Sequence, residues 1–336
     1  MSTPAPWIAQ QRDVLLAQRG HAWLLQGPSG LGQYSLALEL ARAWLCERPS
    51  GAGACGQCGS CHAIEVRTHA DLCVLMPETV MLGLGWSLGE KAQRDIDDKK
   101  RKASREIRVE GMRDAIEFSQ RTSARGNGKV VLVYPPERMN HVTANALLKT
   151  LEEPPGDVRF VLASEAADQL LPTTRSRCLG HTMAWPEEVQ SLDWLNGQGV
   201  QPEDTGVLLR AAGGRPEDAL QLSQSGMDAQ RWRQLPRALA RGDGAGLSDW
   251  APARMVDALQ RLCHDLMAVG VGAPPRFFDL ADLPASGSRL VLARWARELM
   301  RTARTAEHPF NAGLMLEALV SQARSALNSR PPTPIP

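Results

Sequence analysis

The chain of 336 residues carries a formal net charge of +1, with 43% hydrophobic and 22% charged residues. This length exceeds one ordinary hydrophobic core, so we expect a multidomain globular protein, and the near-zero charge argues against a generally basic surface that coats nucleic acid. No apolar run approaches the roughly 18 residues that cross a bilayer, and the first residues lack a signal-peptide pattern, so we expect a cytoplasmic protein with no membrane contact.

The first strong pattern covers residues 21–41, which read as a buried strand, a glycine-rich turn and an amphipathic helix. In the phosphate-binding pattern G-x-x-x-x-G-K-[ST], loop N–H groups cradle phosphates, the Lys reaches the outer phosphates and the hydroxyl holds Mg²⁺. The glycines of such a loop are kept, at Gly27, Gly30 and Gly32. Gln33 stands in place of the Lys and Tyr34 in place of the Ser or Thr. We therefore expect a degenerate phosphate loop that does not support hydrolysis; a glycine-rich turn unrelated to nucleotides is the alternative.

Four cysteines follow the helix in a C-x₈-C-x₂-C-x₂-C spacing, at Cys46, Cys55, Cys58 and Cys61. The surrounding segment is rich in glycine and serine and has little to bury, so a metal must supply its order. Four thiolates suit tetrahedral Zn²⁺, and the glycines permit the tight turns that short spacings require. We predict one structural zinc per chain; an iron–sulfur cluster and a redox-active pair are the rivals. His62 would be a fifth ligand and is better interpreted as a surface histidine. The remaining cysteines are interpreted as buried thiols: Cys73, Cys178 and Cys263.

The middle of the chain alternates apolar strands with helices. Residues 70–78 read as a short apolar strand ended by proline, residues 159–164 read as a buried strand, and 129–133 is the clearest buried parallel strand. The charged stretch 83–108 is interpreted as an inserted or mobile segment; its basic cluster could touch nucleic acid, but a solvated loop is the simpler interpretation. The alternation over residues 21–164 predicts a doubly wound, mostly parallel sheet.

A second catalytic element is missing after the strand at 129–133. In a P-loop ATPase such a strand ends in an acid that holds Mg²⁺, often followed by an acid that activates water. Tyr134 and Pro135 occupy these places. The sequence then continues into a helix that Pro154 stops.

From about Trp185 the pattern is helical. Three apolar stripes with helical spacing are interpreted as bundle core: Met255, Leu259, Leu262 and Leu266; Leu290, Leu292, Trp295 and Leu299; Leu314, Leu316, Leu319 and Val320. Residues 330–336, RPPTPIP, have no core-forming pattern and are expected to be extended and mobile.

These features together resemble the bacterial DNA polymerase III clamp-loader family over nearly the whole chain. The signals are the cysteine spacing after the loop helix, the block NALLKTLEEPP at 145–155, and the triplet Ser176, Arg177 and Cys178. ATPase members of that family keep the loop Lys and the acidic pair. Gln33, Tyr34, Tyr134 and Pro135 place this chain with a subunit that has lost them.

The resemblance implies an α/β fold built on a RecA-like AAA+ domain with a parallel sheet. This domain would span residues 1–165 and carry the zinc module at 46–61. A small helical lid domain would follow at 166–226, then an all-α collar domain at 227–329 that joins a five-subunit assembly, and a mobile tail at 330–336.

Arg177 matches the arginine that family members project into the ATP site of a neighbouring subunit. A guanidinium placed on the γ-phosphate stabilises the charge that develops in phosphoryl transfer. An ordinary surface arginine is the alternative, and Arg175 is a weaker candidate for the same surface. In the lid, Glu217 or an immediate neighbour occupies the place of a sensing arginine, with Arg215 nearby but outside the site.

The implied function is that of a non-catalytic subunit and stator without ATP hydrolysis of its own, although we leave open whether a nucleotide binds the loop. Its partners would be the gamma/tau ATPase subunits and the delta subunit, and through the complex the sliding clamp and primed DNA, as part of the DNA polymerase III holoenzyme. Two alternatives remain: an ATPase in its own right, and a zinc-containing nucleic-acid-binding protein. DNA-contacting residues are not identified by the sequence.

Overall fold

The computed structural model describes residues 4–51, 53–285, 287–306, 308 and 311–329. The chain divides into two compact units, Met1–Pro186 and Glu187–Pro336. We describe each unit by itself. The finer division into three domains stays a prediction, and the tail at 330–336 lies outside the described residues.

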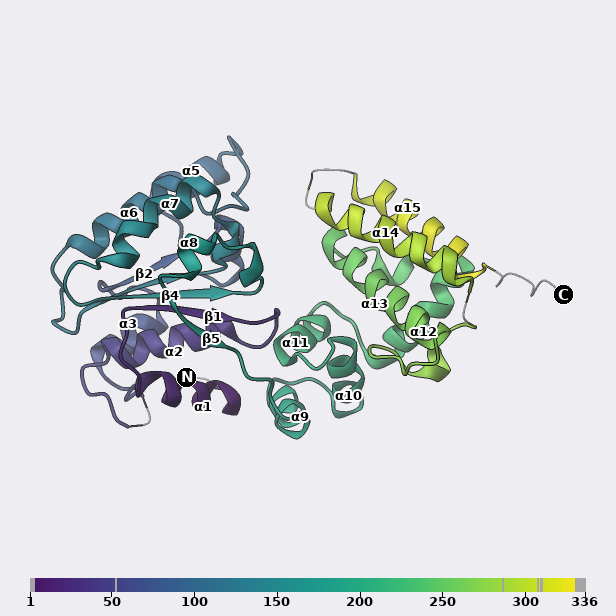
Figure 1. The fold of residues 1–336 in the computed structure, drawn as a ribbon, viewed down its shortest axis with the longest axis horizontal. Coiled ribbons are helices and arrows are strands. Elements are labelled where there is room, and N and C mark those ends of the chain that lie inside the picture. The colour runs from purple at the N-terminus through teal and green to yellow at the C-terminus, as the bar shows by residue number, and fades with distance from the viewer. Residues whose placement is uncertain (1–3, 52, 286, 307, 309–310, 330–336) are drawn as a thin grey trace. The chain divides into compact units, whose positions relative to one another are not determined.

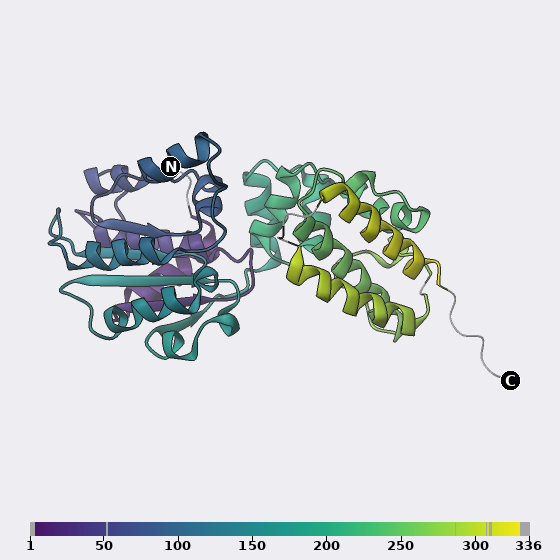
Figure 2. The ribbon, with the colours of Figure 1, turned by 90° about the horizontal axis from the view of Figure 1, so that it is seen from above.

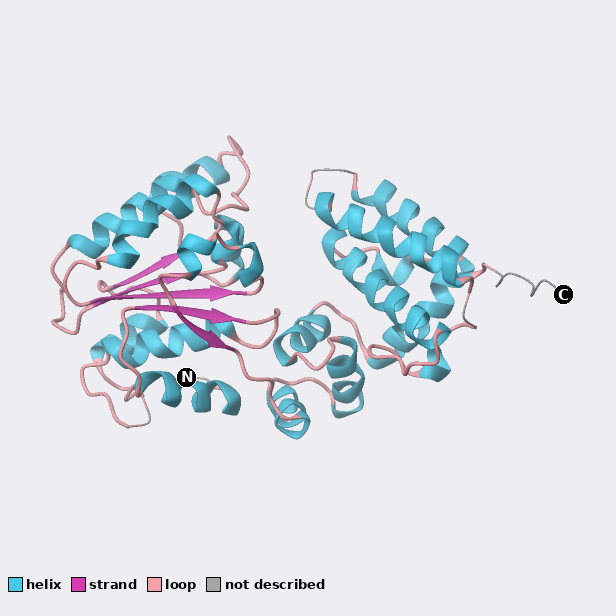
Figure 3. Cartoon of the chain, in the orientation of Figure 1, coloured by secondary structure: helices cyan, strands magenta, loops and turns pink. Residues whose placement is uncertain are grey.

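A parallel sheet forms the centre of the first unit (Figure 3). Within the described residues it has five strands in the order β2-β3-β4-β1-β5. Each pair is parallel, with Leu24 opposite Leu162 and Val131 opposite Phe160. The strands are β1 (Ala22–Gln26), β2 (Leu72–Leu75), β3 (Lys129–Val133), β4 (Val158–Ser164) and β5 (Leu179–Thr182). The predicted parallel sheet is thus confirmed, and all of β3 is buried, as its continuous apolar run requires.

Helices cover both faces of this sheet (Figure 1). On one face lie α1 (Pro6–Leu16), α2 (Gln33–Leu45) and α3 (Gly59–Glu65); on the other lie α6 (Val109–Gln120) and α7 (His141–Glu152). Successive strand side chains point to opposite faces. Leu24, Val131 and Phe160 consequently share one core with Met112 of α6 and Leu147 of α7.

Three parts of the first unit were missed or misread from the sequence. Strand β5 escaped notice because its residues, LGHT, are mostly exposed, and α1 was not recognised. The charged segment 83–108 is not a simple loop: it contains α5 (Glu90–Asp97) and follows α4 (Glu78–Gly83). Arg101 forms two hydrogen bonds to Glu78, at 2.5 and 2.7 Å, so this segment contains a helix and is anchored to α4.

The second unit is helical in its described part, as predicted. Its helices are α9 (Glu188–Gly197), α10 (Pro202–Ala211), α11 (Pro216–Gln224), α12 (Ala229–Arg241), α13 (Pro252–Gly270), α14 (Arg289–Thr305) and α15 (Ala312–Leu327). One apolar core runs from Leu195 of α9 to Leu327 of α15. Figure 2 shows α14 and α15, coloured yellow-green to yellow, beside the green helices of this unit.

Two residues of the expected apolar stripes do not lie in this core. Leu290 is 68% exposed and Leu314 is 66% exposed, because each lies two residues before the next apolar residue of its stripe and therefore about 200° around the helix from it. The other short elements are α8 (Pro172–Arg175), η1 (Pro136–Arg138), η2 (Ala167–Gln169), η3 (Ala245–Leu247) and η4 (Leu280–Asp282). Among the described residues, no helix combines the length and apolar character needed to cross a membrane.

Candidate functional site

The degenerate phosphate loop connects β1 to α2. Gly30 and Gly32 have φ angles of +77° and +94°, a left-handed conformation that glycine adopts without steric cost. Gly32 is the N-cap of α2, so α2 begins directly at Gln33. The indole N–H of Trp7 in α1 donates to the carbonyl of Leu31 at 3.0 Å. The loop therefore keeps the path expected from its glycines and is fixed from outside by α1.

Gln33 uses its amide inside the loop. Its Nε2 donates to the carbonyls of Gly27 at 2.8 Å and Pro28 at 2.7 Å, and lies 3.4 Å from the carbonyl oxygen of Ser164 at the end of β4. The residue is only 2% exposed. A lysine here would extend toward phosphate, whereas this glutamine ties the loop to itself and to the sheet.

Three aromatic side chains meet at the N-terminal end of α2. The rings of Tyr34 and Tyr134 stack with centroids 5.3 Å apart, and the indole of Trp86 donates to the Tyr34 hydroxyl at 2.7 Å. Burial raises the pKa of Tyr34, so the phenol stays neutral at physiological pH. Trp86 comes from the charged segment that the sequence left without a role. The hydroxyl that would hold Mg²⁺ in an ATPase is replaced here by a buried, hydrogen-bonded phenol.

The residues that follow β3, where an ATPase carries its acidic pair, make structural contacts. The Tyr134 hydroxyl donates to Glu165 at 2.7 Å. Glu137, which the sequence analysis passed over, accepts from the Ser164 hydroxyl at 3.0 Å and from the backbone N–H of Glu165 at 2.9 Å. An acidic side chain three residues after Tyr134 is the sequence feature that could have identified Glu137. Because this carboxylate accepts hydrogen bonds at the carboxyl end of β4, it holds that end of the strand in place.

The four predicted cysteines come together. Their sulfurs lie within 4.8 Å of one another, and the group could hold a metal ion. The Cys46 sulfur is 3.8 Å from that of Cys58 and 3.7 Å from that of Cys61. A tetrahedral centre with Zn–S near ~2.3 Å separates its sulfurs by about 3.8 Å. The donor set and its spacing therefore fit zinc, and all four cysteines are free thiols in this structure.

The thiols of this group differ in how readily they ionise. Backbone N–H groups of Gln57 and Cys58 point at the Cys55 sulfur and lower its pKa to about 6. Burial raises the pKa of Cys61 to about 12. In the metal-free chain one thiol is thus ready to ionise and another resists, and a bound cation would supply the charge that keeps all four ionised.

Glu47 fixes the cysteine segment to the rest of the first unit. Its Oε1 accepts from the backbone N–H of Ser60 at 3.0 Å, from the Ser60 hydroxyl at 3.1 Å and from Arg125 at 2.8 Å. The loop that carries Arg125 is itself held by buried Asp71, which accepts from the Arg125 N–H at 2.9 Å and from Lys129 at 3.1 Å. Burial opposes ionisation of Asp71, but these hydrogen bonds hold its pKa below the ordinary value.

His62 is exposed and does not join the cysteine group, in agreement with its interpretation as a surface residue. Of the three remaining cysteines, Cys263 is buried as expected, whereas Cys73 and Cys178 are half-buried. Desolvation raises their pKa values, to about 11 for Cys73 and about 12 for Cys178 and Cys263. These are unreactive thiols at neutral pH.

Arg177 lies just after α8 and is partly exposed. Its Nε and Nη2 donate to Glu152 at 3.2 and 3.0 Å, and its Nη1 donates to the carbonyl of Thr173 at 2.9 Å. Arg175 is exposed. Arg177, unlike Arg175, is therefore held in a defined orientation by the end of α7 and by α8.

Glu217 is in the first turn of α11. Arg215 is the N-cap residue of the same helix and pairs with Asp218 at 2.9 Å, so its guanidinium is engaged in an ion pair at the N-terminus of α11. Both residues belong to the second unit, and their relation to the phosphate loop stays a prediction.

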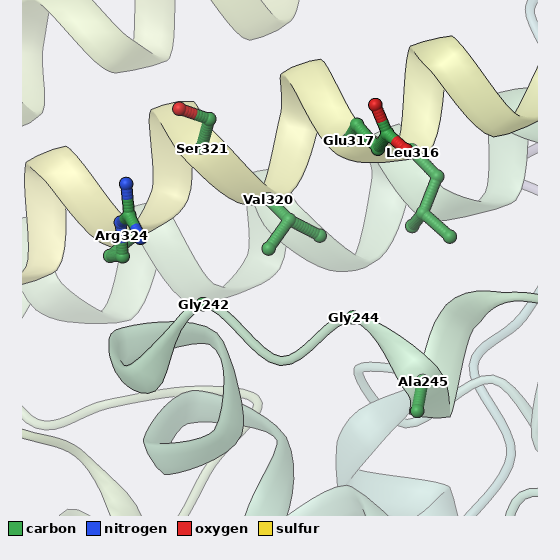
Figure 4. Close-up of a pocket in the computed structure, with 8 residues that line it drawn as sticks. All are labelled: Gly242, Gly244, Ala245, Leu316, Glu317, Val320, Ser321 and Arg324. Atoms are coloured by element: carbon green, nitrogen blue, oxygen red, sulfur yellow. The ribbon is translucent and has the colours of Figure 1, made fainter.

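A groove of about 350 Å³ lies in the second unit, between α15 and the segment 242–245 (Figure 4). Leu316 and Val320 point toward that segment, and Glu317 and Arg324 also line the groove. This mixture lacks a clustered set of catalytic groups, so the phosphate loop, the cysteine group and Arg177 remain the functional candidates.

The chain was compared with known proteins. The family model described as DNA polymerase III, delta subunit, matches residues 9–185. DNA polymerase III subunit delta' of Pseudomonas aeruginosa is 39% identical, over 91% of this chain and 92% of that protein. The same subunit of Escherichia coli is 32% identical, over 82% of each chain.

Among solved structures, a DNA polymerase III gamma subunit-related protein of Thermotoga maritima superposes with a TM-score of 0.52 at 17% identity. The match covers 96% of this chain and 100% of that one. At this identity the likeness concerns the fold alone, and it agrees with the predicted parallel-sheet domain followed by a helical C-terminal region.

Proposed function

The chain belongs to the family of DNA polymerase III delta' subunits, and from this membership we propose that it is a non-catalytic, stator-like subunit of the clamp loader. In this role it assembles with the gamma/tau ATPase subunits and the delta subunit. The complex uses ATP to open the sliding clamp and load it onto primed DNA during replication. The chain acts as a component of the polymerase holoenzyme and has no ATPase activity of its own.

The observation that carries the non-catalytic assignment is the hydrogen bonding of Gln33. An ATPase needs a cation aimed at the outer phosphates, and here a neutral amide donates to the loop carbonyls of Gly27 and Pro28 instead. Tyr34 and Tyr134 support the same conclusion, because a stacked aromatic pair stands where the Mg²⁺ hydroxyl and the first acid belong.

We further propose that Arg177 acts in trans on the ATP bound by a neighbouring subunit. Its guanidinium is partly exposed and is oriented by Glu152 and Thr173, which suits a group that must meet a phosphate supplied by another chain. A planar guanidinium binds phosphate oxygens in a fork that a lysine cannot reproduce.

Zinc is the metal we propose for the cysteine group, as a structural ion held by Cys46, Cys55, Cys58 and Cys61. Four cysteine ligands leave no open position for substrate, so the ion would order the segment 46–62 and take no part in hydrolysis. An iron–sulfur cluster would colour the protein and appear in its absorption spectrum, which separates the two metals directly.

The deciding experiment compares the isolated chain with a complex reconstituted from candidate gamma/tau and delta subunits. We expect negligible ATP turnover by the isolated chain, and DNA- and clamp-stimulated turnover by the complex that depends on its presence. Sustained turnover by the isolated chain, abolished by Gly32→Ala, would show an ATPase in its own right. Tight DNA binding by the isolated chain without any contribution to the complex would favour a zinc-containing nucleic-acid-binding protein.

A further inference from the structure

Two acceptors from different elements bind the guanidinium of Arg177 at separate positions. Oε2 of Glu152, the last residue of α7, accepts from Nε at 3.2 Å and from Nη2 at 3.0 Å. The carbonyl of Thr173 in α8 accepts from Nη1 at 2.9 Å. The plane of the guanidinium is therefore fixed by the ends of two helices.

Not every N–H donor of this guanidinium has an acceptor within the described part of the chain. A guanidinium has five N–H donors, and three of them are engaged by Glu152 and Thr173. One N–H on Nη1 and one on Nη2 have no acceptor among the described residues. A guanidinium whose Nη1 and Nη2 each keep an N–H can bind two phosphate oxygens with its Nη edge.

We infer that Glu152 is a positioning residue for Arg177: it binds the Nε side of the guanidinium and thereby presents the Nη1/Nη2 fork to a phosphate brought by a neighbouring subunit. This inference rests on the proposed role of Arg177. A flexible arginine loses less conformational freedom on binding when its side chain is already held in the bound orientation.

The opposite role, in which Glu152 withholds Arg177, fits the contacts less well. A carboxylate that competes with phosphate would take the Nη1/Nη2 fork in a bidentate pair, whereas Glu152 uses a single oxygen on the other side. The Arg177 and Glu152 side chains are 29% and 60% exposed, so their pair is weak enough to adjust when phosphate arrives.

The test uses the reconstituted complex and measures kcat and KM for DNA- and clamp-stimulated ATP hydrolysis. Four variants are compared: Glu152→Ala, Glu152→Gln, Arg177→Ala and the double variant Glu152→Ala/Arg177→Ala. Glu153→Ala is the matched control, since it removes a carboxylate from the neighbouring exposed position. Assembly is checked by gel filtration, so that a variant that fails to join the complex is recognised.

We expect Glu152→Ala to lower the Arg177-dependent part of kcat by roughly two- to fivefold, which is the value of a half-exposed ion pair expressed as a rate. Glu152→Gln should retain more activity than Glu152→Ala, because its amide oxygen can still accept from Nε. Glu153→Ala should be unchanged. In the Arg177→Ala background, Glu152→Ala should have no further effect, since a positioning residue acts only through the group it positions.

The outcomes separate this inference from the proposed function. If Arg177→Ala leaves hydrolysis unchanged in an assembled complex, the finger itself is wrong. If Arg177→Ala lowers hydrolysis but Glu152→Ala does not, or if Glu152→Ala raises it, only the positioning role is overturned. Equal losses from Glu152→Ala with and without Arg177 would likewise overturn it, by showing that Glu152 acts independently.

Discussion

Gln33 and Arg177 are two polar residues of the same unit with opposite patterns of hydrogen bonding. Gln33 is 2% exposed and directs its amide at carbonyls of its own chain. Arg177 is partly exposed and keeps two donors without an intrachain acceptor among the described residues. A side chain whose donors all bind its own chain contributes to stability. An oriented guanidinium that keeps two N–H donors without an acceptor within the described residues is arranged for a ligand or partner.

Arg177→Ala should remove hydrolysis at one interface of the reconstituted complex while leaving assembly intact. Trans-acting arginines contribute about 10³-fold or more in rate, but the other sites keep their own fingers, so total turnover should fall only in part. Arg177→Lys should rescue poorly, because a point charge does not reproduce the planar fork. Arg175→Ala serves as the matched control, and unchanged stimulated hydrolysis and clamp loading in the Arg177→Ala complex would leave this subunit as scaffold alone.

The cysteine group tests the contrast with a site proposed to bind an external ion. Cys58→Ser should lower zinc content and weaken metal binding by at least ~10²-fold, because a serine hydroxyl replaces a thiolate ligand. Metal analysis of the purified variant, with Cys73→Ala as control, measures this effect. Hydrogen exchange should show loss of protection at 46–62 but not in β3 or β4, whose residues have their own apolar core. A variant that retains full zinc would contradict the assignment.

Zinc affinity should also fall as the pH is lowered. The ligands must lose their protons to bind metal, and the pKa of Cys61 in the metal-free chain is raised to about 12 by burial, so binding displaces protons at neutral pH. Metal release followed with a chromogenic chelator should increase steadily on acidification. Release that is independent of pH would argue against thiolate ligation.

Gln33→Ala should destabilise the first unit by about 1–3 kcal/mol, because it removes a buried side chain together with its hydrogen bonds to the loop and to buried Ser164. Chemical denaturation of the isolated chain gives this value, with Gln18→Ala, at an exposed position, as control. Arg177→Ala should cost less than about 1 kcal/mol in the same experiment, since a partly exposed ion pair contributes little. Equal losses for the two variants would remove the distinction between them.

The smallest expected effect is that of restoring the consensus loop. The double variant Gln33→Lys/Tyr34→Thr should give no sustained ATP turnover, because Tyr134 and Pro135 still occupy the places of the acidic pair. Turnover is measured with the purified double variant, beside the unmodified chain. Hydrolysis at a rate typical of an ATPase would show that the loop alone had silenced the site.

The sequence was most informative where residue type alone decides the chemistry. A neutral Gln33 cannot replace a lysine, and the spacing of Cys46 to Cys61 brings four thiols within reach of one another whatever the surrounding fold. Continuous apolar runs such as Lys129–Val133 likewise identify buried parallel strands. Strand β5 could not be recognised in this way, because its pairing with β1 depends on backbone hydrogen bonds and its side chains are mostly exposed.

The sequence by itself thus determined the replacement of the phosphate-loop consensus residues, the presence of four closely spaced cysteines and the parallel sheet, because each depends on residue identity or on local periodicity. Only the tertiary structure decided which groups meet across the chain. It brought Trp86 to Tyr34, 52 positions apart, and Glu152 to Arg177, 25 positions apart. Such contacts depend on how separate helices pack on one sheet, and no local pattern records the relative placement of two side chains that distant elements carry.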